Sequence, residues 1–166
     1  MAPSNREEKE MASRSMIRKS LLVACAAVTL VASPAWAATR SHSDLEALPD
    51  VVTAKPGGTT TVHGTVANTG PDRTTSPFTV TVTLPAGVTA EGPFFPTSCV
   101  VGFAGHMVRC QYPAGLGLHT ATALVPVRIA KSLRVSVDLV GWVTVTSPDD
   151  SNPKNNMATV TIHVRP

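Results

Sequence analysis

Residues 78–84 read Phe78-Thr79-Val80-Thr81-Val82-Thr83-Leu84, the most regular alternation of apolar and polar side chains in the chain. A period of two places the apolar residues on one face of a β-strand and the threonines on the other. Similar alternations, separated by turn residues, recur over residues 51–54, 60–67, 121–129 and 158–164. Threonine and valine favour a pleated, half-buried surface, whereas proline and glycine mark turns. The pattern therefore predicts an all-β domain.

Three further strands are predicted in less regular segments. Short strands near 99–103 and 106–111 flank the turn residues Ala104-Gly105, and a longer run covers 133–145, in which Gly141 predicts a bulge or bend. About seven to eight strands with frequent turns and no crossover helix are typical of an immunoglobulin-like antiparallel two-sheet sandwich. A closed barrel fits the same strand count and stays open as an alternative.

Residues 1–37 have the three parts of a cleavable signal peptide. Basic residues precede an apolar run over 21–31, and Ala35-Trp36-Ala37 then offers small side chains for cleavage after Ala37. The basic segment leaves the start of translation open among Met1, Met11 and Met16. A secreted, disulfide-permissive destination is therefore predicted.

A competing signal lies within this leader, where Leu22-Val23-Ala24-Cys25 matches a lipobox. Apolar residues continue well past Cys25, and only a short apolar run precedes it, which is the wrong context for lipidation. We therefore expect free secretion, with the protein extracellular or loosely associated with the cell wall.

The rest of the chain is predicted to hold one domain. Residues 38–47 are polar and without periodicity, which predicts a short flexible tail, and residues 48–166 are predicted to form the sandwich. Residues 38–166 carry nine Lys/Arg and eight Asp/Glu, so their net charge of +1 predicts no nucleic-acid partner. No segment after the leader approaches the ~20 apolar residues of a membrane helix, so no membrane span is predicted.

Two cysteines lie in the exported part of the chain, Cys99 and Cys110. An even pair outside the cell predicts a disulfide, and turn residues at Ala104-Gly105 would let two neighbouring strands bring the sulfurs together. We expect this bond to be structural, because no third exported cysteine exists to exchange with it.

Side chains that bind metals or catalyse reactions are scattered. The sequence shows no recurring ligand spacing among its histidines, which are His42, His63, His106, His119 and His163. Residues 149–156 are rich in oxygen ligands but lack the EF-hand spacing, so a calcium loop and a plain hairpin loop both stay open. No nucleophile elbow, zinc-protease motif or phosphate loop is present. We predict no enzyme, no cofactor and no metal site.

Aromatic residues are few, and three of them form a possible contact patch. Phe94 and Phe95 lie between Gly92 and Pro96, and Trp142 alternates with small and apolar neighbours. Exposed aromatic side chains often anchor binding partners. The alternative is that the phenylalanine pair caps one end of the sandwich core.

Four motifs occur in order along the chain: Asn68-Thr69-Gly70-Pro71, the strand running into Leu84-Pro85-Ala86-Gly87-Val88, the two cysteines, and Asp150-Ser151-Asn152-Pro153 before Asn155-Asn156. Together they resemble the bacterial surface module named domain of unknown function eleven, over about residues 45–164. The resemblance implies an immunoglobulin-type sandwich used in secreted and cell-wall proteins, often in tandem repeats.

These inferences lead to one expected function. We expect a non-catalytic extracellular structural or binding module that acts as a monomer at or near the bacterial cell surface. Its expected partner is an extracellular protein or a cell-wall component. A carbohydrate-binding module is the alternative, for which exposed aromatic residues including Tyr112 would have to lie in one plane. A small secreted hydrolase or an inhibitor is a further alternative.

Overall fold

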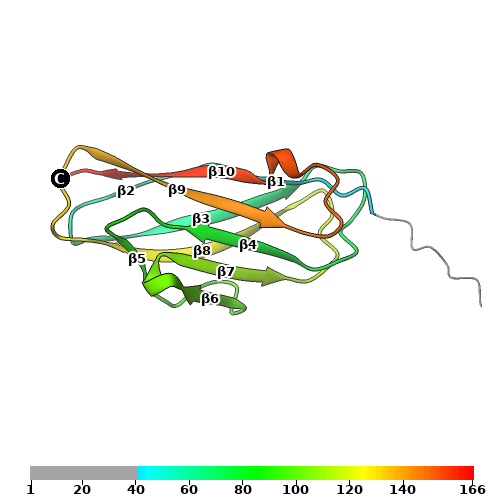
Figure 1. Cartoon of the computed structure of the whole chain (residues 1–166), viewed down its shortest axis with the longest axis horizontal. Coiled ribbons are helices and arrows are strands. Elements are labelled where there is room, and N and C mark those ends of the chain that lie inside the picture. Colours follow the sequence, from blue (N-terminus) through cyan, green and yellow to red (C-terminus); the bar gives the residue numbers. More distant parts are fainter. Residues whose placement is uncertain (1–40) are drawn as a thin grey trace, which may run out of the picture. The chain divides into compact units, whose positions relative to one another are not determined.

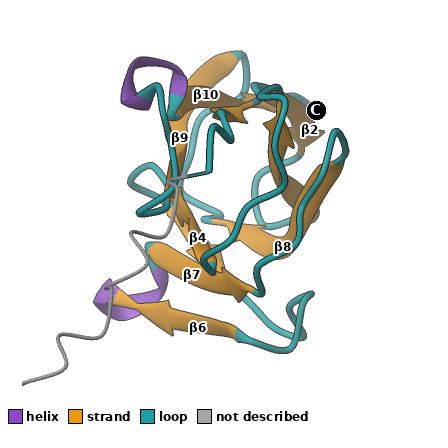
Figure 2. Ribbon diagram, turned by 90° about the vertical axis from the view of Figure 1, so that its right-hand side faces the viewer, coloured by secondary structure: helices purple, strands orange, loops and turns teal. Residues whose placement is uncertain are grey.

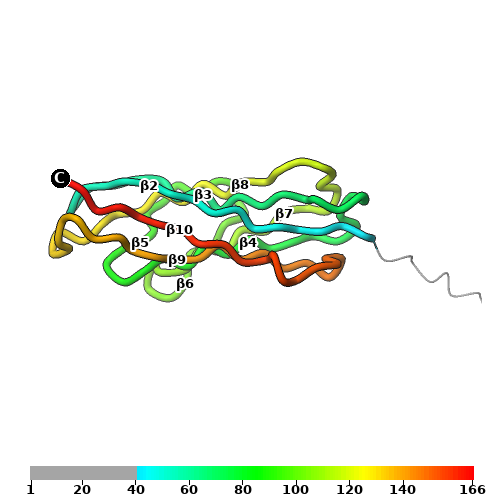
Figure 3. The backbone as a smooth tube through the Cα atoms, turned by 90° about the horizontal axis from the view of Figure 1, so that it is seen from above, coloured from blue at the N-terminus to red at the C-terminus, as the bar shows by residue number. Residues whose placement is uncertain are grey.

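The computed structural model describes residues 41–166, which form a sandwich of two β-sheets (Figures 1 and 3). The smaller sheet has the order β1-β3-β8-β5, with bounds Leu45–Ala47, Thr59–Asn68, Thr120–Ile129 and Val88–Ala90. The larger sheet has the order β2-β10-β9-β4-β7-β6, with bounds Asp50–Ala54, Met157–Val164, Val137–Thr146, Phe78–Thr83, Met107–Tyr112 and Cys99–Gly102. Two short 3-10 turns, η1 (Phe103–Gly105) and η2 (Pro153–Asn155), complete the described elements.

The core lies between the two sheets and consists largely of valines. In β4, Phe78, Val80 and Val82 are buried, whereas the threonines between them are partly exposed on the opposite face. The same alternation in β8 buries Val125 and Val127 against them. Because branched side chains pack well on pleated sheets, the period of two in the sequence is enough to define the inner face of each long strand. The predicted all-β sandwich is confirmed.

All strand pairs are antiparallel except one. β2 and β10 run parallel, with Val52 opposite Ile162, so the second and the last strand of the described domain lie side by side. A parallel pair needs a long connection between its strands, and here almost the whole domain supplies it. Residues 41–166 contain ten strands. β1 and β5 went unpredicted because three residues are too few to show a period.

The expected flexible tail over residues 38–47 differs from the structure in its described part, residues 41–47. Leu45 is fully buried in β1 and pairs with Asn68 of β3. Ser43 is also buried, and its hydroxyl donates a hydrogen bond to the Asp149 carbonyl at 3.2 Å. The polar side chains that indicated a tail are hydrogen-bonded to the domain, so this segment is part of the sandwich.

The predicted bulge at Gly141 is wrong, because β9 continues without interruption through this residue, which pairs with Val160. The long run over 133–145 is shortened at its other end, since the strand begins at Val137, just after Ser136 with φ +64°. A Cβ atom at Gly141 would lie 2.4 Å from the Thr83 carbonyl oxygen. The glycine therefore allows a close approach of β4 to β9.

The predicted signal peptide and the lipobox at Cys25 lie outside the described residues. Within residues 41–166, no helix is long and apolar enough to cross a membrane.

Candidate functional site

Four strands of the larger sheet present a polar outer face, which we call the threonine face. The alternation that buries the valines of β4 directs Thr79, Thr81 and Thr83 outward. In the register of the sheet, Thr144 of β9 lies beside Thr81, and Thr146 lies beside Thr79. On the other side of β4, the outward residues of β7 continue the same rows. The threonine face therefore consists of the outward side chains of β9, β4, β7 and β6.

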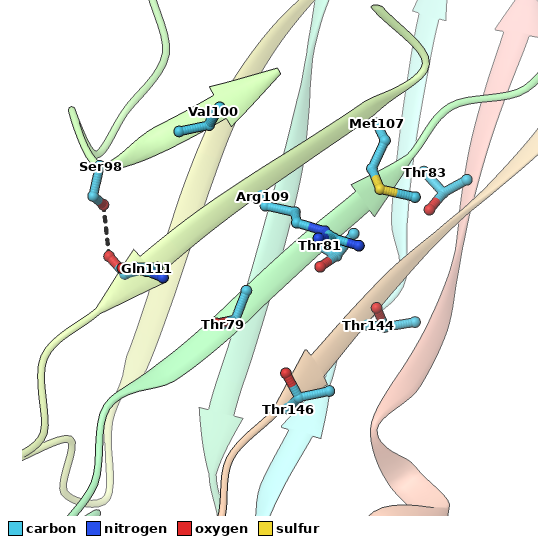
Figure 4. Close-up of a pocket in the computed structure, with 10 residues that line it drawn as sticks. All are labelled: Thr79, Thr81, Thr83, Ser98, Val100, Met107, Arg109, Gln111, Thr144 and Thr146. Atoms are coloured by element: carbon cyan, nitrogen blue, oxygen red, sulfur yellow. Dashed lines mark hydrogen bonds between the residues drawn. The ribbon is translucent and has the colours of Figure 1, made fainter. Parts of the chain in front are cut away.

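The threonine face is hollowed, and the hollow has a volume of about 700 Å³. Figure 4 shows its threonine floor together with Met107, Arg109 and Gln111 of β7, and with Ser98 and Val100 toward β6. The Ser98 hydroxyl donates a hydrogen bond to the Gln111 carbonyl at 2.6 Å. Hydroxyl and amide groups give this surface hydrogen-bonding capacity, and the methyl groups of threonine keep part of it apolar.

Arg109 is the one ionisable residue that lines this hollow. Its neighbours in the register are Thr81 on β4 and Val100 on β6. Figure 4 shows its side chain extended along the sheet beside Thr81. Among the described residues it has no ion pair, whereas Arg165 contacts Asp138 at 2.7 Å. A guanidinium without a carboxylate presents its donors to a ligand, and it matches a carboxylate in shape and charge.

A second, apolar hollow of about 230 Å³ adjoins the first and shares Val100, Met107 and Arg109 with it. Its remaining lining comes from the end of β6 and the start of η1, where Val101 and Phe103 lie. Val100, Val101 and Phe103 are 69%, 45% and 75% exposed. We call the segment Cys99–Phe103 the β6 edge. Sequence analysis missed this site, although a short disulfide-linked hairpin with apolar residues at successive positions was a usable signal.

The disulfide between Cys99 and Cys110 is confirmed. The two residues are register partners in β6 and β7, with an S–S distance of 2.07 Å and Cα atoms 3.9 Å apart. Cys110 belongs to the core, and Cys99 packs against it. The bond therefore fastens the outermost strand of the larger sheet to the rest of the domain.

The predicted contact patch of Phe94, Phe95 and Trp142 is divided between the two sheets. Phe94 packs against the core, and Phe95, 59% exposed, forms a β-bridge with Leu124 beside the smaller sheet. Trp142 lies on the outer face of the larger sheet, between Thr83 and Thr159 in the register. The structure therefore does not bring these three aromatic residues together.

Tyr112, the fourth aromatic considered for sugar binding, is also turned away from the threonine face. Its ring stacks on Phe78, with centroids 5.0 Å apart and planes 5° apart. Burial raises the pKa of Tyr112 to about 12. A flat sugar-binding platform would need these rings side by side and exposed, and this arrangement does not provide one.

The oxygen-rich loop over residues 149–156 connects segments at one end of the sandwich. The carboxylate of Asp149 accepts hydrogen bonds from the backbone and hydroxyl groups of both Thr75 and Ser76. Asp150 accepts from the backbone of Leu45 at 3.1 Å and from Asn156. Burial acts to raise the pKa of Asp149, but the hydrogen bonds from Thr75 and Ser76 outweigh it and hold this pKa below its ordinary value. These carboxylates thus fasten three chain segments to one another.

Two of the histidines considered as metal ligands, His63 and His163, lie on different sheets, each beside an aspartate. His63 is on β3 of the smaller sheet, 3.4 Å from Asp50, and His163 is on β10 of the larger sheet, 2.7 Å from Asp138. Hydrogen bonds from His163 and Arg165 hold the pKa of Asp138 below its ordinary value. In the described part of the chain, no three His, Cys, Asp or Glu side chains are grouped as metal ligands would be.

Comparison with known proteins gives structural likeness only. No protein-family model and no curated protein sequence matches the chain. A chain in the crystal structure of Coh-OlpC–Doc435, a type I cohesin–dockerin complex from Clostridium thermocellum, is similar at 13% identity and a TM-score of 0.51, covering 75% of this chain and 96% of that chain. A variant of BcpA, the major pilin subunit of Bacillus cereus, is similar at 10% identity and a TM-score of 0.52, covering 75% of this chain and 40% of the pilin. These likenesses show that the sandwich fold is shared.

Proposed function

We propose that this chain is a non-catalytic, secreted module that binds a protein partner through the threonine face, at or near the bacterial cell surface. The observation that carries this proposal is the hollow of about 700 Å³ with Arg109 at its border and without a carboxylate in its lining. The hollow adjoins exposed apolar residues, and apolar side chains beside hydrogen-bonding groups and an arginine are the usual composition of a protein interface.

The chemistry of the lining supports binding over catalysis. General acid–base catalysis uses groups that gain and lose a proton near neutral pH, whereas a guanidinium stays protonated there. The hollow holds threonines, a serine, a glutamine, two apolar side chains and Arg109. Enzymes commonly assemble carboxylates, histidines or a metal in such a place.

A protein partner is favoured over a sugar, because the aromatic residues are dispersed. Two exposed aromatic residues lie near the hollow, Trp142 on β9 and Phe103 in the adjoining apolar hollow, and strands β4, β7 and β6 separate them. In the cohesin–dockerin complex named above, a protein partner accompanies the similar sandwich. This supports the same class of use for the present chain.

An extracellular location is supported by two observations. Residues 1–37 have the pattern of a signal peptide, and the disulfide belongs to an oxidising compartment. We also propose membership of the domain of unknown function eleven. In support, its predicted motifs lie at the end of β3, along β4, at the disulfide and just before β10.

Binding by matched surface variants tests this function. Thr144→Arg fills the threonine face, and Thr122→Arg places the same side chain on the outer face of the smaller sheet, where Thr122 pairs with Thr65. Immobilised residues 38–166 are incubated with secreted proteins and, separately, with purified wall fragments of the source cells. We expect a protein to be retained by the parent domain and by Thr122→Arg but not by Thr144→Arg.

Three outcomes contradict the proposal. Retention that is equal in both variants places the contact elsewhere. Retention of wall glycan without protein assigns the face to a carbohydrate. Turnover in a hydrolase screen by the purified domain, lost in Thr144→Arg, makes the module an enzyme.

A further inference from the structure

We infer that the partner of the threonine face is an extended peptide segment with one carboxylate among apolar side chains, which adds as a new strand to the β6 edge beside Arg109. This inference rests on the proposed function and names the chemical class of its partner. The occupant is a segment of another protein.

β6 has one side without a neighbouring strand. Among the described residues it is an edge strand of the larger sheet that pairs with β7, and Figure 2 shows no strand beyond it. The Cys99 N–H donates a hydrogen bond to the Pro96 carbonyl at 3.1 Å, so Val100, Val101 and Gly102 form the part of the edge that a partner strand could pair with. Proteins usually protect such edges with very short strands, charges or prolines. β1 and β5 have three residues each and β2 begins with Asp50, whereas β6 has four residues without charge or proline. β6 is itself short, but it has neither charge nor proline, and such an edge is a template for the addition of a short strand.

The disulfide makes this edge a firm template. Cys99 is bonded to Cys110, which is completely buried in the core. The strand is thereby fastened at one end, and hydrogen bonds with β7 order the remainder. A partner strand therefore loses its own conformational freedom on binding, but it does not have to order β6 as well.

Apolar side chains flank the open edge on both faces of the sheet. Val100 shares the outer face with Arg109, whereas Val101 is the register partner of Val108, a buried core residue. Phe103 follows with φ +48°, a left-handed conformation that is rare for a large side chain, and is 75% exposed. Strained residues of this kind concentrate at functional sites. Alternating side chains of an added strand would contact Val100 on one face and Val101 on the other.

Arg109 defines the charge of the partner. It is the one charged residue in the lining of both hollows, and neither lining contains an aspartate or a glutamate. An added strand would lie two strand spacings from β7, about 10 Å. An arginine and a glutamate side chain together span that separation once the Arg109 side chain, which lies beside Thr81 of β4 in Figure 4, turns toward β6. A carboxylate on the partner would thus neutralise Arg109 and fix the register of the added strand.

Selection from a random peptide library displayed on phage, with residues 38–166 as the target, tests this inference. We expect the selected peptides to contain an aspartate or glutamate flanked by apolar residues. Replacing that acid by its amide, or making Arg109→Gln, should weaken binding by about tenfold to a hundredfold, as expected for a charge-assisted hydrogen bond. Arg128→Gln is the matched control, because Arg128 lies on the other sheet and contacts Glu91.

Strand addition is tested separately from charge. Successive N–H groups of a strand point in opposite directions, so only every second N–H group of the peptide can bond to β6. N-methylation of these positions should abolish binding, whereas N-methylation of the positions between them should not. Val101→Lys should block binding, whereas Val51→Lys, on the opposite edge strand β2, should not. Val51 is itself 62% exposed, so neither substitution removes a core side chain.

The outcomes separate this inference from the proposed function. Peptides blocked by Thr144→Arg but indifferent to Arg109→Gln, or to methylation of either set, overturn the strand addition and leave the binding face standing. An added strand would lie four strand spacings from β9, so Thr144→Arg alone does not test it. Peptides indifferent to Thr144→Arg, Arg109→Gln and Val101→Lys overturn both. Self-association of the domain that Val101→Lys abolishes would make a second copy the occupant, which also overturns the inference.

Discussion

Reduction of the Cys99–Cys110 disulfide ought to lower the free energy of unfolding by an amount that loop closure sets. The bonded positions are separated by 11 in sequence. A crosslink of that span removes about 9 cal/mol/K of entropy from the unfolded chain, which is about 2.8 kcal/mol at 25 °C. A domain of this size has a total stability of about 5–15 kcal/mol, so the bond contributes a substantial share of it.

The structure offers a clean way to isolate this contribution. Cys99 and Cys110 face each other directly across β6 and β7, so the reduced thiols can remain where the sulfurs are. Comparing oxidised and reduced forms of the same chain leaves every side chain in place. The double variant Cys99→Ala/Cys110→Ala also removes the buried Cys110 sulfur, so we expect it to lose about 1 kcal/mol more.

Denaturation in urea, followed by fluorescence of Trp142 in residues 38–166, gives the free energy of each form. Amide exchange should show that reduction accelerates opening at Val100 and Val101 more than in the central strand β3. A difference between oxidised and reduced protein below about 1 kcal/mol would refute the loop-closure reasoning. Equal exchange at the β6 edge in both forms would show that β7 alone holds β6.

Four other substitutions or measurements test the remaining parts of the structure. Asp149→Asn should cost about 1–3 kcal/mol at pH 7, because it removes a carboxylate that accepts several hydrogen bonds. The pKa of Asp149 is lowered in the folded protein, so the stabilisation by its carboxylate is complete above the ordinary pKa near 3.8 and disappears as the pH falls through the lower folded pKa. Urea denaturation should therefore show that the free energies of unfolding of the variant and its parent differ at pH 7 and converge below pH 3.8. A difference that stays constant with pH would contradict this. Gly141→Ala should cost about 1–3 kcal/mol because its Cβ would lie 2.4 Å from a β4 carbonyl oxygen, and an unchanged urea midpoint would disprove that clash. Leu45→Ala should cost about 2–5 kcal/mol if β1 is part of the fold, whereas a loss under 1 kcal/mol would restore the flexible tail. Mass spectrometry of protein from the medium should find an unmodified N-terminus at Ala38, and an acylated N-terminus at Cys25 would contradict free secretion.

The alternation of side chains was sufficient to predict most strands, because the side-chain period of a strand is a local property of the backbone. Residues 78–84 show this directly: every apolar residue from Phe78 to Leu84 is buried. The pairing of Cys99 with Cys110 was equally accessible, since the two lie on consecutive strands of one hairpin. The burial of Leu45 could not be predicted, because the strand Leu45–Ala47 has too few positions to show a period.

The candidate site depended on the tertiary structure. Thr144, Thr81 and Arg109 are far apart in the sequence and adjacent only because β9 pairs with β4 and β4 pairs with β7. A period of two shows which side of a strand faces outward, but it does not identify the neighbouring strand. The order of the strands is set by the burial of the inner valines of all strands in one core, which is favourable, and by the entropy lost when distant segments are brought together, which is unfavourable. For the same reason, the sequence alone predicted a polar loop at 149–156, and only the assembled sandwich placed its carboxylates against Thr75, Ser76 and Leu45.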